Sequence, residues 1–271
     1  MREATADMRL LITNDDGWGA EGLEVLRQIA EQISSDVWII APEVNQSGAS
    51  HSMTLHEPLR CKQLDKRTFI IRGTPTDCVI MGVRHFMLES PPDLILSGVN
   101  HGSNLAEDVT YSGTIAAAME GSLLGIRSIA MSQTGGSIGE GTIYWQTPLT
   151  HGPGIVSRLL HASWPPGIVI NVNYPPRPPQ EVTGIEVTRQ GRRDQALLNI
   201  DKRNDPWGTP YFWFGFERPP SKVVKGTDLG AIDEGRISVT PLMLDLTDTE
   251  TGDALKRAFP FEHAGKASRR A

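Results

Sequence analysis

The chain has 271 residues and a formal net charge of −6 at pH 7, and 39% of its residues are hydrophobic. This is the composition of an ordinary soluble globular protein, and the negative charge argues against a protein that coats a nucleic-acid polymer. No apolar run approaches the roughly 20 residues that a membrane span needs, and residues 1–7 lack the apolar core of a signal peptide. We therefore expect a cytoplasmic protein with no membrane partner, whose two cysteines, Cys61 and Cys78, stay reduced.

The first predicted element is a buried strand that ends in a run of polar side chains. Leu10–Thr13 is apolar with a β-branched residue, and Asn14, Asp15 and Asp16 follow it directly. In open α/β sheets, ligands bind beyond the carboxyl ends of the parallel strands. Two adjacent carboxylates at such a place repel each other and lose hydration, so they need a cation, a shared proton or strong hydrogen bonds. A divalent metal ion is the simplest of these partners.

Strands and helices alternate along the next 160 or so residues. Apolar residues at helical spacing between Leu23 and Ile33 predict the first helix, and Thr74, as N-cap before Pro75, predicts a helix that runs to Met87. The other predicted strands are Val37–Ala41, the hairpin of Leu59–Leu64 and Thr68–Arg72, Asp93–Ser97, Ser128–Ser132 and Gly167–Val172, and further helices start at Tyr111–Thr114 and span Leu149–His161. This alternation predicts an α/β fold, a Rossmann-like three-layer α/β/α sandwich with a mostly parallel sheet.

The pattern changes beyond Pro175. Ile185–Thr188, the aromatic cluster Tyr211–Phe214 and Ile237–Thr240 suggest antiparallel β elements, and Thr249–Phe259 predicts a last helix. We therefore expect three kinds of region. They are an α/β core (8–190 and 236–260), a β-rich extension that serves oligomerisation (191–235), and flexible ends (1–7 and 261–271).

A glycine motif after the first strand offers a competing interpretation. Gly17, Gly19 and Gly22 match the dinucleotide-binding fingerprint, and Glu43 beyond the second strand could bind a ribose. That interpretation predicts an NAD-dependent oxidoreductase. However, Asp15 and Asp16 stand directly before the turn, where their charges would oppose a pyrophosphate. The alternative is that these glycines only permit a tight turn and close helix packing.

Other predicted loops at the same sheet edge offer neutral oxygens and anion donors. Carboxylate, hydroxyl and amide oxygens suit Mg²⁺ or Mn²⁺ rather than zinc, and a helix that starts near Ser112 offers its N-terminus to a phosphate. The candidate oxygens come from Asn45, Ser47, Ser50, Ser97, Asn100 and Asn104. His51 and His101 are candidates for a general acid, although loop histidines are commonly only solvated. Because the two aspartates are adjacent rather than in a D-x-D pattern, we favour direct attack by metal-activated water.

Five motifs make the chain recognisable, and in this order they resemble the SurE family of nucleotidases. They are Asn14–Gly17, Asn45–Ser50, Gly73–Asp77, Ser97–Asn104 and Tyr111–Gly121. Asp205–Tyr211, Thr227–Asp228 and Ser238–Pro241 also look like the family, so the resemblance covers about residues 8–245.

The resemblance implies a metal-dependent hydrolase of nucleoside 5′- and 3′-monophosphates, a phosphoric monoester hydrolase of the 5′-nucleotidase type. It implies one divalent ion, Mg²⁺ or Mn²⁺, per subunit, and assembly as homodimers or homotetramers. Its metal ligands carry over to Asp15, Asp16, Ser47 and Asn100, and the residues near the phosphate carry over to Asn104, Ser112, Gly113 and Thr114. Asp15, Asp16, Asn104 and Ser112 are the expected catalytic set.

Two expectations remain open at this point. A non-catalytic nucleotide sensor could use the same pocket, as could the NAD-dependent oxidoreductase described above. The aromatic residues from Tyr211 to Phe216 predict a homodimer through residues 195–245 by exchange of β elements, and packing back on their own domain is the alternative.

Overall fold

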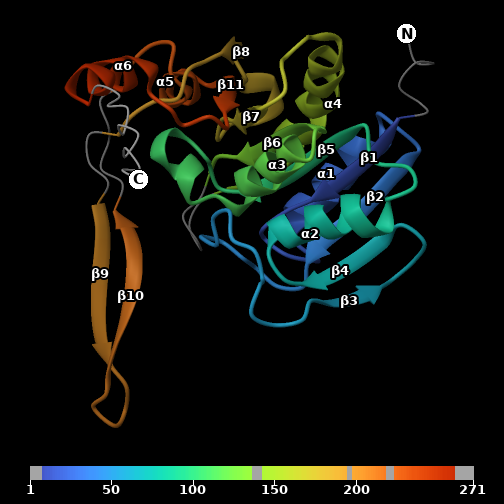
Figure 1. Cartoon of the computed structure of the whole chain (residues 1–271), viewed down its shortest axis with the longest axis horizontal. Coiled ribbons are helices and arrows are strands. Elements are labelled where there is room, and N and C mark those ends of the chain that lie inside the picture. The colour runs from blue at the N-terminus through green and yellow to red at the C-terminus, as the bar shows by residue number, and fades with distance from the viewer. Residues whose placement is uncertain (1–7, 136–141, 194–196, 218–222, 260–271) are drawn as a thin grey trace, which may run out of the picture.

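The computed structural model describes residues 8–135, 142–193, 197–217 and 223–259, and it is built around one nine-stranded sheet (Figure 1). The strand order is β3-β4-β2-β1-β5-β6-β7-β11-β8. The strands of this sheet are β1 Arg9–Thr13, β2 Asp36–Pro42, β3 Arg60–Gln63, β4 Thr68–Arg72, β5 Leu94–His101, β6 Arg127–Gln133, β7 Ile168–Tyr174, β8 Gly184–Val187 and β11 Arg236–Met243. All pairings are parallel except β3 with β4 and β7 with β11, which confirms the α/β fold with a mostly parallel sheet.

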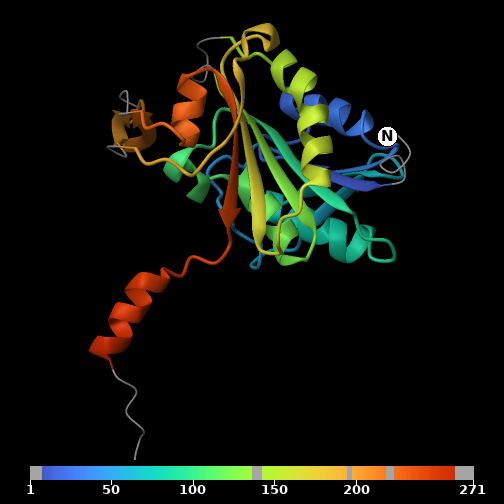
Figure 2. The same cartoon turned by 90° about the horizontal axis from the view of Figure 1, so that it is seen from above.

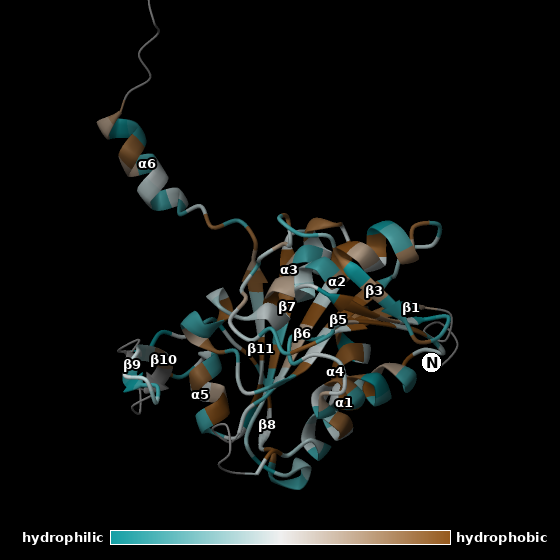
Figure 3. Cartoon of the chain, turned by 90° about the horizontal axis from the view of Figure 1, so that it is seen from below, coloured by the Kyte–Doolittle hydropathy of each residue, from teal (hydrophilic) through white to brown (hydrophobic). Residues whose placement is uncertain are grey.

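Helices cover both faces of the sheet, so the core has two halves (Figure 3). The helices are α1 Glu21–Glu31, α2 Pro75–Met81, α3 Gly113–Leu123, α4 Gln146–His161, α5 Asp228–Asp233 and α6 Thr249–Ala258. Helices α1 and α4 pack on one face, and α2 and α3 pack on the other. Strand β1 supplies both halves: Leu10 and Ile12 join one apolar cluster and Leu11 joins the other. A strand buried on both faces needs such a continuous apolar run.

A local sequence signal explains where α2 begins. The Thr74 hydroxyl accepts a hydrogen bond from the backbone N–H of Asp77, whose carboxylate accepts from the Thr74 N–H in return, so the predicted cap of α2 is a full capping box. The α-helix ends at Met81, short of the predicted end at Met87, and a π-helical turn over Gly82–Phe86 follows it.

Two further sequence predictions were wrong in detail. Strand β5 does not end at Ser97 but runs to His101, with a register irregularity against β6 between Ser97 and Asn100. Asn100 therefore lies in a strand rather than in the loop after it. Strand β8, expected to be antiparallel, pairs in parallel with β11. Strand β11 is antiparallel to its other neighbour, β7.

Two elements extend away from this body. Strands β9 Leu197–Asn204 and β10 Pro210–Glu217 form a separate antiparallel hairpin that projects in Figure 1, and α6 points outward in Figures 2 and 3. The predicted aromatic cluster falls on β10, where both Trp213 (61% exposed) and Phe214 (71% exposed) face solvent. These two aromatic side chains are therefore not buried against their own chain.

The remaining features of the fold concern the chain ends, the cysteines and membrane spans. The ends expected to be flexible, residues 1–7 and 261–271, lie outside the described residues. Both cysteines are free, Cys61 exposed and Cys78 buried. Within the described part of the chain, no helix has the length and apolar character needed to cross a membrane.

Candidate active site

Asp15 is the buried centre of the candidate site, just beyond the carboxyl end of β1. Its side chain is only 3% exposed. One carboxylate oxygen accepts a hydrogen bond from the Thr114 hydroxyl of α3. Burial raises the pKa of Asp15 to about 6, with a smaller contribution from the charge of Asp16, while the hydrogen bonds from Thr114 oppose the shift. The pair of carboxylates is therefore held at an energetic cost.

Asp16 points from the same turn toward the end of β5. Its Oδ2 accepts a hydrogen bond of 2.9 Å from the backbone N–H of His101. Burial again raises the pKa of Asp16, against the stabilising effect of that hydrogen bond. Asn100, the residue before His101, is buried and donates its side-chain amide to the Gly102 carbonyl at 2.9 Å. The β5 extension thus brings Asn100 next to the aspartate turn.

The loop after β2 is attached to the same turn. The backbone N–H of Gln46 donates to the Asp15 carbonyl at 2.7 Å, and Asn45 accepts from the Ser47 N–H at 2.7 Å through its side-chain oxygen. Ser47 is exposed and follows Gln46, the residue bonded to the Asp15 carbonyl. Ser50, another candidate oxygen, donates its hydroxyl to the Thr110 carbonyl and so anchors the loop instead.

The N-terminus of α3 closes the site from the other face of the sheet. Ser112 is the N-cap, and its hydroxyl accepts from the Ile115 N–H at 3.1 Å while keeping its own proton to donate. A Cβ on Gly113 would lie 2.8 Å from the Cβ of Asp15, so only glycine allows this close approach. The positive end of α3 is thereby directed at Asp15.

Asn104 lies in a buried amide network that the sequence analysis did not identify. Its backbone N–H donates to Asn173 Oδ1 at 2.9 Å, its carbonyl accepts from Asn171, and its own amide donates to Ser132 Oγ at 2.8 Å. The hydrogen bonds of Asn104 thus run to β6 and β7 rather than to the aspartates. Two asparagines two residues apart in the otherwise apolar strand β7 were the available signal, since polar side chains in a buried strand need partners.

The glycine fingerprint has a structural explanation. Gly17 and Gly19 have φ values of +92° and +85°, which L side chains rarely adopt. A Cβ on Gly22 would lie 1.9 Å from the Val99 carbonyl oxygen, so Gly22 lets α1 pack directly on the β5 backbone. The three glycines form the turn and the helix contact, which is the alternative given above.

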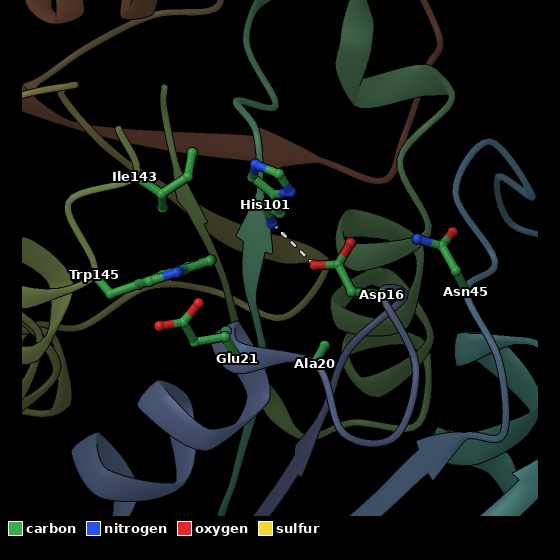
Figure 4. A pocket seen from close by; sticks show the side chains of 8 residues that line it. Asp16, Ala20, Glu21, Asn45, His101, Ile143 and Trp145 are labelled. Carbon is green, nitrogen blue, oxygen red and sulfur yellow. Dashed lines mark hydrogen bonds between the residues drawn. The ribbon is translucent and has the colours of Figure 1, made fainter. Parts of the chain in front are cut away.

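The two candidate histidines occupy different places. His51 lies 3.0 Å from a carboxylate oxygen of Glu120, far along α3 from its N-terminus, and so fastens the loop to the helix. His101 lies next to Asp16 in the wall of a cavity of about 490 Å³ (Figure 4). The cavity lining consists of Asp16, Ala20, Glu21, Gly22, Asn45, His101, Ile143 and Trp145. Of the two histidines, only His101 faces this cavity.

The residues present fit a hard divalent cation. The buried carboxylate of Asp15 lies against the Thr114 hydroxyl, and the half-buried carboxylate of Asp16 shares the cavity wall with the Asn45 amide. Carboxylate, hydroxyl and amide oxygens are the donor set that Mg²⁺ and Mn²⁺ prefer. Among the described residues, no lysine or arginine acts on the pKa of Asp15 or Asp16, and His101 is the one cationic group that favours the ionised form of Asp16. The described residues contain no group of three or more His, Cys, Asp or Glu side chains placed to hold a metal, so any ion here would depend on the neutral oxygens as well.

Comparisons with known proteins identify the family of the chain. The family model described as survival protein SurE matches residues 10–196. The chain is 55% identical over 241 residues to the 5′-nucleotidase SurE of Methylorubrum extorquens (strain PA1), covering 89% of this chain and 95% of that relative. It is 52% identical over 257 residues to the 5′-nucleotidase SurE of Parvibaculum lavamentivorans, covering 95% of this chain and 93% of the relative.

A solved structure extends the likeness to three dimensions. The crystal structure of the SurE protein from Aquifex aeolicus is 39% identical in sequence and superposes with a TM-score of 0.80, over 92% of this chain and 99% of that one. The motifs quoted from the sequence, the sheet order around Asp15 and these matches point the same way. The chain belongs to the SurE family.

Proposed function

We propose that the protein is a metal-dependent phosphomonoesterase that hydrolyses nucleoside 5′-monophosphates, and 3′-monophosphates as well, to nucleoside and phosphate. The observation that carries the proposal is the Asp15–Asp16 pair, which has no lysine or arginine partner among the described residues and whose buried member, Asp15, faces the N-terminus of α3. The SurE relatives named 5′-nucleotidases support the substrate class.

In this proposal, Asp15, Asp16, Ser47 and Asn100 hold one Mg²⁺ or Mn²⁺ ion. When bound, the ion supplies positive charge for the phosphoryl oxygens and acidifies a water molecule for attack on phosphorus. Thr114 fixes Asp15 by hydrogen bonding, and the His101 backbone N–H fixes Asp16, so the carboxylates stay oriented without reorganisation.

The phosphate is assigned to donors at the start of α3. Ser112 retains a hydroxyl proton, and Gly113 and Thr114 place the helix N-terminus beside Asp15. Asn104 completes the expected set, and its position depends on Asn171 and Asn173. Removal of these two partners would therefore disturb a proposed phosphate contact indirectly.

Phosphate release from AMP, measured with Mn²⁺ and then with excess EDTA, tests the proposal. We expect turnover that EDTA abolishes and that added Mn²⁺ restores. Tight nucleotide binding without phosphate release would instead support the sensor, and NAD binding without phosphate release would support the oxidoreductase. Comparing 5′-AMP with 3′-AMP then tests the positional part of the proposal.

We also propose that the chain works as a homodimer or homotetramer. The β9–β10 hairpin carries exposed aromatic residues, and α6 has no buried residue although Leu255 lies on it. Apolar surface on elements that leave the body is typical of an association surface. The sequence prediction placed this interface within residues 195–245, which include the hairpin.

A further inference from the structure

The cavity beside the aspartates has two chemically different ends. At one end lie the Asp16 carboxylate and the Asn45 amide, and at the other lie Ile143 and the indole of Trp145, with His101 between them (Figure 4). Its volume of about 490 Å³ falls in the range of small-molecule sites, roughly 300–1,000 Å³. A phosphate at the aspartate end would leave the Trp145 end for the rest of the substrate.

Trp145 is held in place by the backbone of two other elements. It is the residue that precedes α4, and the Leu149 N–H donates to its carbonyl. A Cβ on Gly22 would lie 3.0 Å from the Cη2 atom of its ring, so the absence of a side chain at Gly22 makes room for the indole edge. The His101 ring lies 6.2 Å away, centroid to centroid, at 57°. The half-buried indole also packs against the main apolar cluster, so it presents an aromatic surface in the cavity wall.

We infer that Trp145 forms the subsite for the nucleobase of the substrate, by stacking against its π-face. This inference rests on the proposed function, because it takes the phosphate to lie at Asp15 and Asp16. Base–aromatic stacking is tolerant of base identity, since every nucleobase has a π-face. The subsite would therefore select nucleotides over other phosphomonoesters without strong preference for one base.

The charge of the cavity favours an uncharged group at this end. Glu21, in the first turn of α1, lines the cavity near Trp145 and presents a carboxylate to it (Figure 4). With Asp16 engaged at the other end, a second phosphate directed toward Trp145 would meet the Glu21 charge. A neutral nucleoside avoids this repulsion, so the cavity suits monophosphates in which the base points toward Trp145.

The experiment compares two substrates that differ only in the base. AMP and ribose 5-phosphate carry the same phosphate and sugar, so the base effect is the ratio of their kcat/KM values. Trp145→Ala should lower kcat/KM for AMP by about 5- to 150-fold, mainly through KM, and change the value for ribose 5-phosphate by less than about twofold. Trp145→Phe should retain most of the preference for AMP, because phenyl rings also stack.

Two further variants separate stacking from folding. Trp145→Leu keeps apolar volume but removes the π-face, so it should resemble the alanine variant if that variant is too unstable to assay. Trp164→Ala removes an indole outside the cavity, where Trp164 lies 4.8 Å beneath the Arg127 guanidinium, and should leave the AMP preference unchanged. Thermal unfolding of each variant accompanies the kinetics.

The outcomes are distinct. Equal losses for AMP and ribose 5-phosphate in folded Trp145 variants, or no loss for either, would overturn the base subsite while leaving the phosphatase intact. A wild-type chain that releases phosphate from neither substrate in the presence of Mn²⁺ would overturn the proposed function and this inference together. A loss confined to AMP supports both.

Discussion

The turn at Asp15 and the β9–β10 hairpin differ in which side chains they bury and which they expose to solvent. At the turn, one carboxylate is buried and its neighbour half-buried, and hydrogen bonds from Thr114 and His101 fix them within one chain. On the hairpin, apolar groups such as Trp213 and Phe214 are exposed and face no partner among the described residues. Each arrangement costs free energy by itself, since buried charge and exposed apolar surface are both unfavourable.

The difference indicates what each region lacks. Among the described residues, the turn has no lysine or arginine partner, so an ion can supply positive charge there. The hairpin lacks apolar cover in the described part of the chain, and another chain can supply it. Variants at the turn should therefore change chemistry and metal dependence. Variants on the hairpin should change assembly and leave the single chain nearly as stable as before.

The largest expected effect is on catalysis at the turn. Asp16→Asn removes one charge from the proposed metal site while keeping an oxygen that can accept the His101 hydrogen bond. Because a bound metal lowers the activation barrier by several kcal/mol, its loss should reduce phosphate release from AMP by orders of magnitude. Metal-titrated activity beside circular dichroism of the same samples checks this. A folded Asp16→Asn protein with near-normal activity would reject the metal assignment.

The second effect concerns the stability of the metal-free protein. The pKa of Asp15 rises from 3.8 to about 6 on folding, which corresponds to a cost of about 3 kcal/mol once both states are ionised. Because the folded pKa is raised, the cost is present above pH 6 and disappears as the pH falls toward 3.8. In EDTA, Asp15→Asn should therefore raise the free energy of unfolding by up to about 3 kcal/mol at pH 7.5 and by less than about 1 kcal/mol at pH 4.

Denaturant unfolding at these two pH values, with and without Mn²⁺, measures the difference. Added Mn²⁺ should stabilise the wild type and not Asp15→Asn, because a ligand that binds only the folded state raises its stability. If Asp15→Asn is less stable than the wild type at pH 7.5 in EDTA, then the buried charge of Asp15 does not destabilise the metal-free protein.

The third effect tests the approach of α3 to Asp15. In Gly113→Ala, the new methyl group would lie 2.8 Å from the Asp15 Cβ and push the helix N-terminus away from the turn. Overpacking of this kind costs about 1–3 kcal/mol of stability, and activity should fall with it. Gly154→Ala is the matched control, since a Cβ on Gly154 in α4 meets nothing within 4 Å. This substitution should raise the free energy of unfolding by up to about 1 kcal/mol, because alanine favours a helix over glycine. Equal behaviour of the two variants would contradict the proposed close contact.

The sequence predicts the local elements of the fold better than the pairing of distant strands. The strand Leu10–Thr13, the α2 cap at Thr74 and the alternation of elements were predictable because they depend on local patterns of apolar and capping residues. The strand-end rule then placed Asp15 and the α3 N-terminus at one edge of the sheet. The parallel pairing of β8 was not predictable, since strand direction depends on where a long connection returns.

The residues that position Asn104 were also not predicted, for a related reason. Asn171 and Asn173 act on Asn104 across about 70 positions of sequence, and no local pattern links them. Trp145 was likewise outside every motif, because its role depends on the space left by Gly22 in another helix. Sequence motifs locate residues on local turns, such as those around Asp15. Contacts between segments far apart in the sequence depend on tertiary packing, which a motif does not show.

The smallest effect on the single chain is expected on the hairpin, and it completes the comparison. Trp213→Ser combined with Phe214→Ser changes side chains that are 61% and 71% exposed, so unfolding of the dilute chain should shift by no more than about 0.5 kcal/mol. Sedimentation at micromolar concentration should nevertheless show smaller assemblies than the wild type, because the removed apolar area is the surface proposed to pair. Leu88→Ser, on the body of the fold and also exposed, should leave the assembly unchanged. A wild type that sediments as a monomer would reject the proposed assembly, and an unchanged oligomer in the double variant would move the interface away from the hairpin.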